Sequence, residues 1–248
     1  MSLFSFSEKH LMEFDGFLSQ SQNRDYGVGK RPHAFAHGFP SVQFGLLPTK
    51  QISREEVFAL SRNVLVNTST VCAGILAWGG MRMANRDRLL STDEWLPVAE
   101  KVRGGGLDRG MVYEAFDLLY QGGRLKGLGP AYFTKLIYFL TPRQAANRHY
   151  AYIMDQWAAC SINLLIGRNV VLMDVVSIWR RDKDNPEASY VVSSANTRSN
   201  YEAFCASMDA LSSHFDKTPD QIDRALLGVG GRNPIGWRKY ILDNRRQF

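Results

Sequence analysis

Two helix-forming stretches joined by a glycine-rich break constrain the fold of this chain most. From Asp108 to Tyr120, apolar residues recur at helical rather than alternating spacing. Gly122 and Gly123 follow, and glycine readily adopts the left-handed conformation in which many helices end. Pro130 then opens a second apolar stretch, at the helical position where its missing N–H is not needed. The sequence therefore predicts two helices and a tight turn over residues 108–140.

The turn itself reads Leu125-Lys126-Gly127-Leu128-Gly129 and is called the hairpin below. Its two glycines allow a sharp turn and a close approach of the backbone to a ligand. The N–H groups that open the next helix point outward and suit a phosphate. We expect Leu128 to face the core and Lys126 to add a positive charge at the rim. Such a segment can hold a nucleic-acid backbone without reading its sequence.

The rest of the chain also predicts helices. Ser53, with Glu56 three residues later, has the pattern of a capping box that starts a helix. The run Thr68–Trp78 is almost wholly apolar and predicts a central buried helix. Residues 169–180 fit either a strand or a buried helix, and we assign a helix; residues 181–200 predict a polar loop. The predicted fold is mostly α, with two helical subdomains, a cleft between them, an N-terminal helix and extended arm over residues 1–50, and a core over 51–248.

Charge and targeting signals narrow the class of protein. The formal net charge is +6, which favours a polyanionic partner. The first 18 residues carry acidic and basic side chains and lack the apolar segment of a signal peptide, so we expect a cytoplasmic protein without a membrane span. His33 and His37 have a spacing that can bind metal, but prolines bracket them and no third ligand is near, so we assign them a structural role and predict no metal.

The hairpin, together with Asp155 at the start of a later helix, resembles the helix-hairpin-helix DNA glycosylases, nearest to the 8-oxoguanine DNA glycosylases. The resemblance implies a protein that binds double-stranded DNA with a damaged or modified base, flips the base out and hydrolyses its glycosidic bond. Asp155 is then the catalytic carboxylate, and the DNA contacts fall on Lys126, Gly127, Leu128, Gly129 and Ala131. Asp155 also fits a simple helix N-cap.

Bifunctional members of that superfamily carry a lysine nucleophile two residues after the second glycine of the hairpin, where this chain has Ala131. Lys135 lies four residues further, on the same helix face. It is either a displaced nucleophile that adds lyase activity or a solvated surface lysine. Some relatives also hold an iron–sulfur cluster on four cysteines; three scattered cysteines do not supply that ligand set, so we predict no cofactor.

A flipped base needs aromatic walls and a polar group for its edge. The candidates are Trp78, Tyr152 and Trp157 for the walls and Gln156 for the edge, although for Trp78 we favour a core tryptophan beside a glycine C-cap. Two other hypotheses stay open, a non-catalytic hairpin module that binds DNA and a helical scaffold. We expect a monomer, and the base can belong to damaged DNA under repair or to modified foreign DNA.

Overall fold

The computed structural model describes residues 5–18, 29–143, 150–178, 187–228 and 235–245. These residues form twelve α-helices, one 3-10 helix and a single pair of strands, so the predicted mostly helical fold is confirmed. None of the described helices has the length and apolar character needed to cross a membrane. The chain divides into two compact units, residues 23–153, here called the hairpin unit, and residues 1–22 with 154–248, here called the Asp155 unit. The predicted boundary at residue 50 lies inside the hairpin unit.

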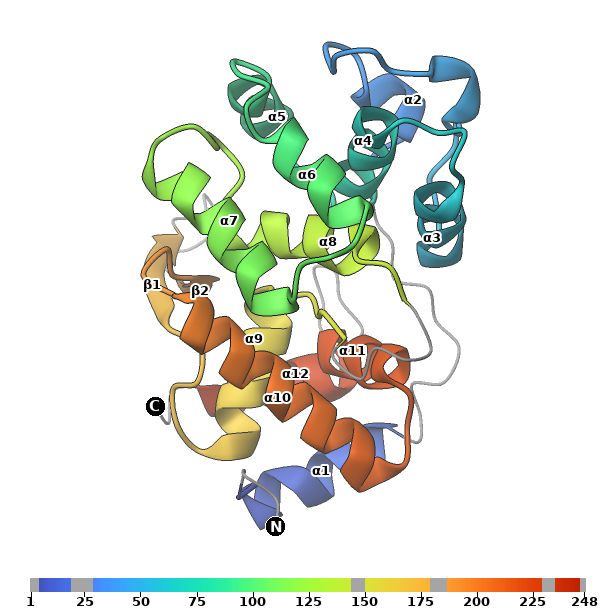
Figure 1. Ribbon diagram of the computed structural model, residues 1–248. Helices are drawn as coiled ribbons and strands as arrows, with labels where there is room; N and C mark the ends of the chain where they lie inside the picture. The colour runs from blue at the N-terminus through green and yellow to red at the C-terminus, as the bar shows by residue number, and fades with distance from the viewer. Residues whose placement is uncertain (1–4, 19–28, 144–149, 179–186, 229–234, 246–248) are drawn as a thin grey trace. The chain divides into compact units, whose positions relative to one another are not determined.

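The hairpin unit is built around α4, which runs from Thr68 to Trp78 as predicted. All eleven of its residues are buried, and α2, α3, α6 and α8 contact it. Figure 1 shows these helices in blue to yellow-green. The helices of this unit are α2 Pro32–Phe35, α3 Arg54–Arg62, α5 Met83–Leu89, α6 Leu96–Arg103, α7 Arg109–Gln121 and α8 Pro130–Leu140, with a 3-10 turn at Phe44–Leu46.

Local capping starts the helices where the sequence places them. The Ser53 hydroxyl accepts from the Glu56 N–H at 3.1 Å, and the Glu56 carboxylate accepts from the Ser53 N–H at 2.7 Å, so the predicted capping box at α3 is confirmed. The α7–α8 pair is held by aromatic contacts, because Phe133 stacks on Phe116 at 5.8 Å and meets Tyr113 edge-on at 5.0 Å. These contacts fix the two helices that flank the hairpin.

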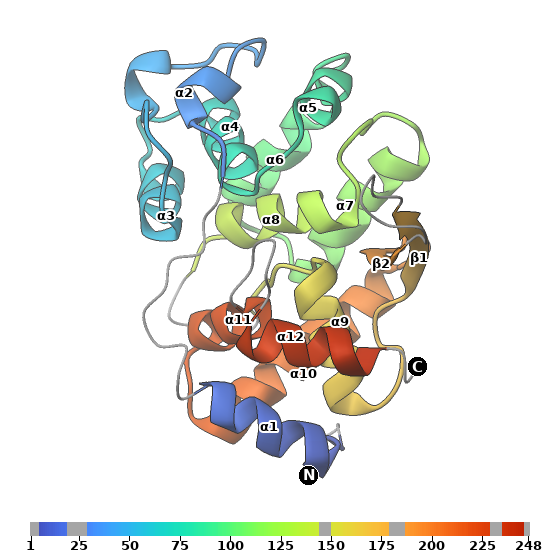
Figure 2. The same cartoon turned by 180° about the vertical axis from the view of Figure 1, so that it is seen from behind.

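The Asp155 unit is built around α9, Gln156–Ile166, which contacts α1, α10, α11, α12 and β2. Figure 2 shows α9 in yellow beside the orange and red helices. The indole N–H of Trp237 donates to Ser161 Oγ at 2.9 Å and links α12 to α9. The helices around α9 are α1 Glu8–Leu18, α10 Arg198–Phe215, α11 Pro219–Leu227 and α12 Gly236–Asn244.

The helix predicted for residues 169–180 is wrong. Strand β1, Met173–Ile178, pairs antiparallel with β2, Glu187–Val192, in a register from Met173↔Val192 to Ile178↔Glu187. The second strand lies inside the stretch predicted as a polar loop. β-branched side chains favour extended backbone, and the exposed Val175, at 62% exposure, shows that this apolar segment is not a buried helix.

Candidate functional site

The hairpin is fixed at both ends by its own sequence. The Asp108 carboxylate accepts from the Met111 N–H at 2.7 Å and caps α7. That helix ends at Gly122, and Gly123 takes the left-handed conformation with φ +69°. Leu125 and Leu128 are both buried, so the predicted inward position of Leu128 is confirmed. Two buried leucines therefore anchor the turn in the core of the unit.

The two hairpin glycines have different structural roles. Gly127 has φ +79°, and a Cβ added to it falls 2.4 Å from the carbonyl oxygen of Asn85 in α5. Gly129 has φ −75°, and a Cβ added there first meets the Tyr120 ring, at 3.9 Å. The fold therefore requires glycine at Gly127, whereas no described neighbour requires it at Gly129. At Gly127 the close neighbour is the Asn85 backbone, whereas close approach of a ligand to Gly129 stays a prediction.

The N-terminus of α8 offers groups that suit an anion. Pro130 is its first residue and has no N–H, and the N–H groups of Tyr132 and Phe133 donate to the carbonyl oxygen of Gly129 at 2.8 and 3.0 Å. The N–H of Ala131 has no acceptor among the described residues, at a position where a helix supplies none. The Lys126 side chain, in the turn that precedes this helix, is exposed. A helix N-terminus attracts negative charge through its dipole and its open N–H groups. The start of α8 and the exposed Lys126 of the hairpin thus both carry the positive charge that suits an anion.

Lys135 is a buried residue rather than a surface lysine. Its side chain is largely covered, at 8% exposure, and Nζ donates to the carbonyl oxygen of Ala131 at 2.8 Å. Side chains of a helix lean toward its N-terminus, which explains this direction. The ammonium group also lies 5.3 Å from the centre of the Tyr132 ring. The solvated-surface hypothesis for Lys135 is therefore wrong, and its charge lies beside position 131.

Two elements that the sequence left without a role lie against this surface. The side-chain stem of Lys135 runs along Gly79, since a Cβ added there falls 2.7 Å from Lys135 Cδ. On α5, Arg82 approaches Tyr132: burial raises the pKa of the Tyr132 phenol, while the Arg82 charge and a backbone hydrogen bond from Arg82 oppose the rise. The arginine-rich composition of residues 82–88 was the signal for this second basic element.

The predicted base-pocket aromatics of the hairpin unit are core residues. Trp78, at 8% exposure, contacts Phe139 edge-on with ring centres 4.9 Å apart, and the Arg54 guanidinium lies 5.2 Å over its ring. Its indole N–H is buried without a hydrogen-bond partner among the described residues. Tyr152 is completely buried. Neither ring presents an open face to a ligand here.

Asp155 is the N-cap of α9. Its Oδ1 accepts from the N–H groups of Trp157 and Ala158 at 2.9 and 3.1 Å, so the capping role is confirmed. Within the described parts of the chain, Oδ2 receives no hydrogen bond. One carboxylate oxygen therefore fixes the side chain against the first turn of α9.

The residues that follow Asp155 supply an aromatic and an amide group. Gln156 and Trp157 are half-buried in the first turn of α9. The Arg238 guanidinium lies 4.3 Å over the Trp157 ring and donates through Nε to the carbonyl oxygen of Leu227 at 3.0 Å. Trp157 is thus held on one face by a cation, an arrangement that fixes the ring.

No three His, Cys, Asp or Glu side chains of the described residues gather as a metal site. The rings of His33 and His37 pack edge-on at 6.1 Å, and both contact Phe44. Their described contacts are those of a packed aromatic cluster.

A search of curated proteins and a search of solved structures returned no match. A family model does match residues 28–227, which is most of the chain and includes the hairpin, Lys135 and Asp155. That model is described as "Putative 8-oxoguanine DNA glycosylase OGG-like protein". The chain belongs to this OGG-like family.

Proposed function

We propose that this protein is a DNA glycosylase that flips a damaged or modified base out of double-stranded DNA and hydrolyses its N-glycosidic bond. The family match supports the reaction class. The observation that carries the proposal is the surface at the start of α8, where a glycine that the fold does not need stands beside a buried lysine ammonium and an exposed lysine.

In this proposal the hairpin binds the phosphate backbone of the DNA. A phosphate oxygen accepts from the N–H of Ala131 at the start of α8, and Lys126 adds charge without base recognition. Gly129 then leaves room for the phosphate. A side chain at that position meets no described atom of the protein closer than 3.9 Å, so it would obstruct only the DNA. Leu128 acts indirectly, by anchoring the turn in the core.

Asp155 stabilises the charge of the reaction. As the bond between C1′ and the base nitrogen breaks, the base leaves with the electron pair and the sugar becomes cationic. A carboxylate lowers the energy of that cation or accepts a proton from the attacking water. The water oxygen bonds to C1′, and a proton goes to the departing base. Because Oδ1 accepts from two backbone N–H groups, we assign to Oδ2 the stabilisation of the cation or the acceptance of the proton.

Lys135 is assigned as the nucleophile of a lyase step. Its Nζ lies 2.8 Å from the carbonyl oxygen of Ala131, the residue that occupies the position of the superfamily lysine. Lys135 stands four residues after that position, and its long side chain brings Nζ back to it. A neutral amine attacks C1′ of the abasic sugar, loses water to form a Schiff base and permits cleavage of the strand.

The rival is a non-catalytic hairpin protein that binds DNA. The burial of Trp78 and Tyr152 favours it, because two of the three predicted base walls present no open face. Catalysis then has to use Trp157 and Gln156 for the base.

A base-release assay separates the two proposals. Duplexes with oxidised, alkylated or hypermodified bases are incubated with the protein, and the free base is measured by chromatography. Release from one class supports the glycosylase and identifies repair or defence against modified DNA as its setting. Binding of plain duplex that weakens steeply with salt, without release from any duplex, supports the rival.

A further inference from the structure

A cavity of 540 Å³ lies at the other end of α8, away from the hairpin. It opens to solvent and is lined by the C-terminal ends of α3, α6 and α8 and by Thr68, the first residue of α4. None of the residues predicted for DNA contact or catalysis lines it. Its volume falls in the range of about 300–1,000 Å³ that small-molecule sites occupy.

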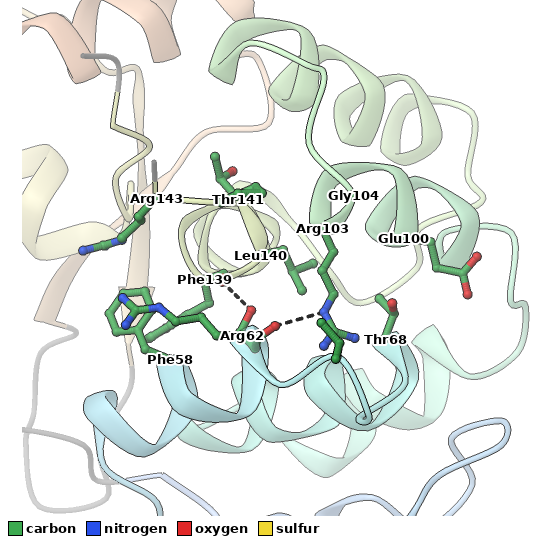
Figure 3. A pocket seen from close by; sticks show the side chains of 13 residues that line it. Phe58, Arg62, Thr68, Glu100, Arg103, Gly104, Phe139, Leu140, Thr141 and Arg143 are labelled. Atoms are coloured by element: carbon green, nitrogen blue, oxygen red, sulfur yellow. Dashed lines mark hydrogen bonds between the residues drawn. The ribbon is translucent and has the colours of Figure 1, made fainter. Parts of the chain in front are cut away.

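The charge of the cavity wall is mainly positive. Three arginines, Arg62, Arg103 and Arg143, face one glutamate, Glu100. Figure 3 shows Arg143 and Glu100 on opposite sides of the opening. In the part of the chain that the structure describes, neither Arg62 nor Arg103 has a carboxylate within 4.0 Å. The N-terminus of α4 adds a positive dipole end at Thr68. The wall therefore attracts an anion.

Arg103 holds one rim of the cavity in place. Its guanidinium donates to the carbonyl oxygens of Ser61, in the last turn of α3, and of Asn63 and Val66, which follow that helix. Val64, at the tip of this turn, is 91% exposed and lines the cavity. An aliphatic side chain thus lies in solvent beside the arginines, where an apolar part of a ligand can contact it.

A second rim combines cations with an aromatic ring. The guanidinium of Arg143 lies 4.1 Å over Phe58 and that of Arg62 lies 5.4 Å from the same ring centre. Stacking on Phe58 restricts both side chains, so less entropy is lost when they bind an anion. Arginine matches phosphate geometry with paired N–H donors.

We propose that this cavity is a nucleotide-binding site, with the phosphate on Arg62 and Arg143 and the sugar or base against Val64. A nucleotide joins an anionic group to an apolar ring system, which is the pairing that the wall presents. The nucleotide is either free or one unit of a single strand, since the phosphate chemistry is the same. The site does not depend on base excision by the protein.

Binding experiments with matched probes test the site. Thymidine 5′-monophosphate, thymidine and inorganic phosphate are titrated calorimetrically, and a short oligothymidylate is followed by fluorescence anisotropy. The variant Arg62→Gln removes an exposed arginine that makes no described structural hydrogen bond, so it leaves the melting temperature unchanged. Lys101→Gln is the matched control, because Lys101 is an exposed cation of α6 that does not line the cavity.

The wild type is expected to bind the monophosphate or the oligonucleotide more tightly than thymidine. Arg62→Gln weakens that binding about tenfold, the usual scale for one charge-assisted hydrogen bond. Glu100→Gln tightens it, because it removes the one acidic group of the wall, and Lys101→Gln changes it little. If these variants change the affinity for the monophosphate, the site binds free nucleotides. If they change only the affinity for the oligonucleotide, the site binds a single strand.

Equal effects of Arg62→Gln and Lys101→Gln, or no tightening by Glu100→Gln, overturn the proposal. So does equal affinity for thymidine and both phosphorylated probes. The outcome is separate from that of the glycosylase assay. If the protein releases a base but the variants do not change nucleotide affinity in this way, the nucleotide site is excluded and the proposed function stands.

Discussion

Replacing the two hairpin glycines separately with alanine tests their different roles. In Gly127→Ala the new Cβ falls 2.4 Å from the carbonyl oxygen of Asn85 and 3.0 Å from its carbonyl carbon, and both are backbone atoms that cannot turn aside. The residue also keeps φ +79°, which costs an alanine about 1–2 kcal/mol. Overpacking adds about 1–3 kcal/mol. We therefore expect a loss of about 2–5 kcal/mol in the free energy of unfolding.

Gly129→Ala has little structural cost. Its φ of −75° suits alanine, and the nearest atom to the new Cβ lies at 3.9 Å. The gain from a less flexible unfolded chain, about 0.4–1 kcal/mol, offsets the weaker N-cap, so stability changes by less than about 1 kcal/mol. Binding of plain duplex at low salt is expected to fall about tenfold, because the methyl group blocks a charge-assisted contact between backbone N–H and phosphate.

Urea denaturation gives the free energies, and anisotropy with labelled duplex gives the affinities. The reasoning predicts that stability separates the two variants and that Gly129→Ala loses affinity while it stays folded. Equal stability of both variants contradicts the packing argument at Gly127. Wild-type affinity of Gly129→Ala contradicts the assignment of Gly129 to a phosphate.

Three further predictions follow from the same geometry. Lys126→Gln should leave stability unchanged and reduce the slope of log affinity against log salt by about 0.9, because one exposed phosphate contact is lost; an unchanged slope excludes the contact. Lys135→Met should keep the packing against Gly79 and abolish the covalent adduct that borohydride traps on abasic duplex, and an adduct at the wild-type level removes the nucleophile role. Burial raises the pKa of the Cys160 thiol to about 12 and also raises that of Cys72. Both thiols should therefore resist an aromatic disulfide reagent at pH 8 until urea unfolds the chain. Above pH 9 a thiol ionises in the unfolded chain but not in the folded one. Each of the two thiols should therefore lower the free energy of unfolding by about 1.4 kcal/mol per pH unit there. Rapid labelling of the native protein contradicts this burial.

Helix starts were predictable because their signals are local. Ser53, Asp108 and Pro130 each act within one helical turn, and the structure places α3, α7 and α8 at those residues. The apolar run Thr68–Trp78 was predictable for the same reason, because a segment without a polar face has to be buried. Strand β1 was not, because its partner β2 lies nine residues further along the chain and pairing is a non-local property.

The sequence predicted which residue types the candidate site contains, but not the burial and packing of those residues. Burial of Lys135 depends on Gly79, which lies 56 positions earlier, and no local pattern relates the two. The demand for glycine at Gly127 likewise comes from the backbone of Asn85 in α5. The arginine cavity collects charged side chains from α3, from α6 and from the segment after α8, and in the sequence these look like ordinary solvated residues.

The most direct test of the central claim is base release by Asp155→Asn in a single-turnover assay on the duplex that the wild type cleaves. Asparagine caps helices as well as aspartate and keeps the Oδ1 acceptor for Trp157 and Ala158, so the change removes the charge and spares the fold. Asp108→Asn, at the N-cap of α7, is the matched control.

We predict that Asp155→Asn binds and melts like the wild type and releases the base at least about a hundredfold more slowly, the scale for loss of one group that stabilises transition-state charge. The control should keep the wild-type rate. Release by Asp155→Asn at the wild-type rate contradicts the role of this carboxylate and with it the proposed mechanism.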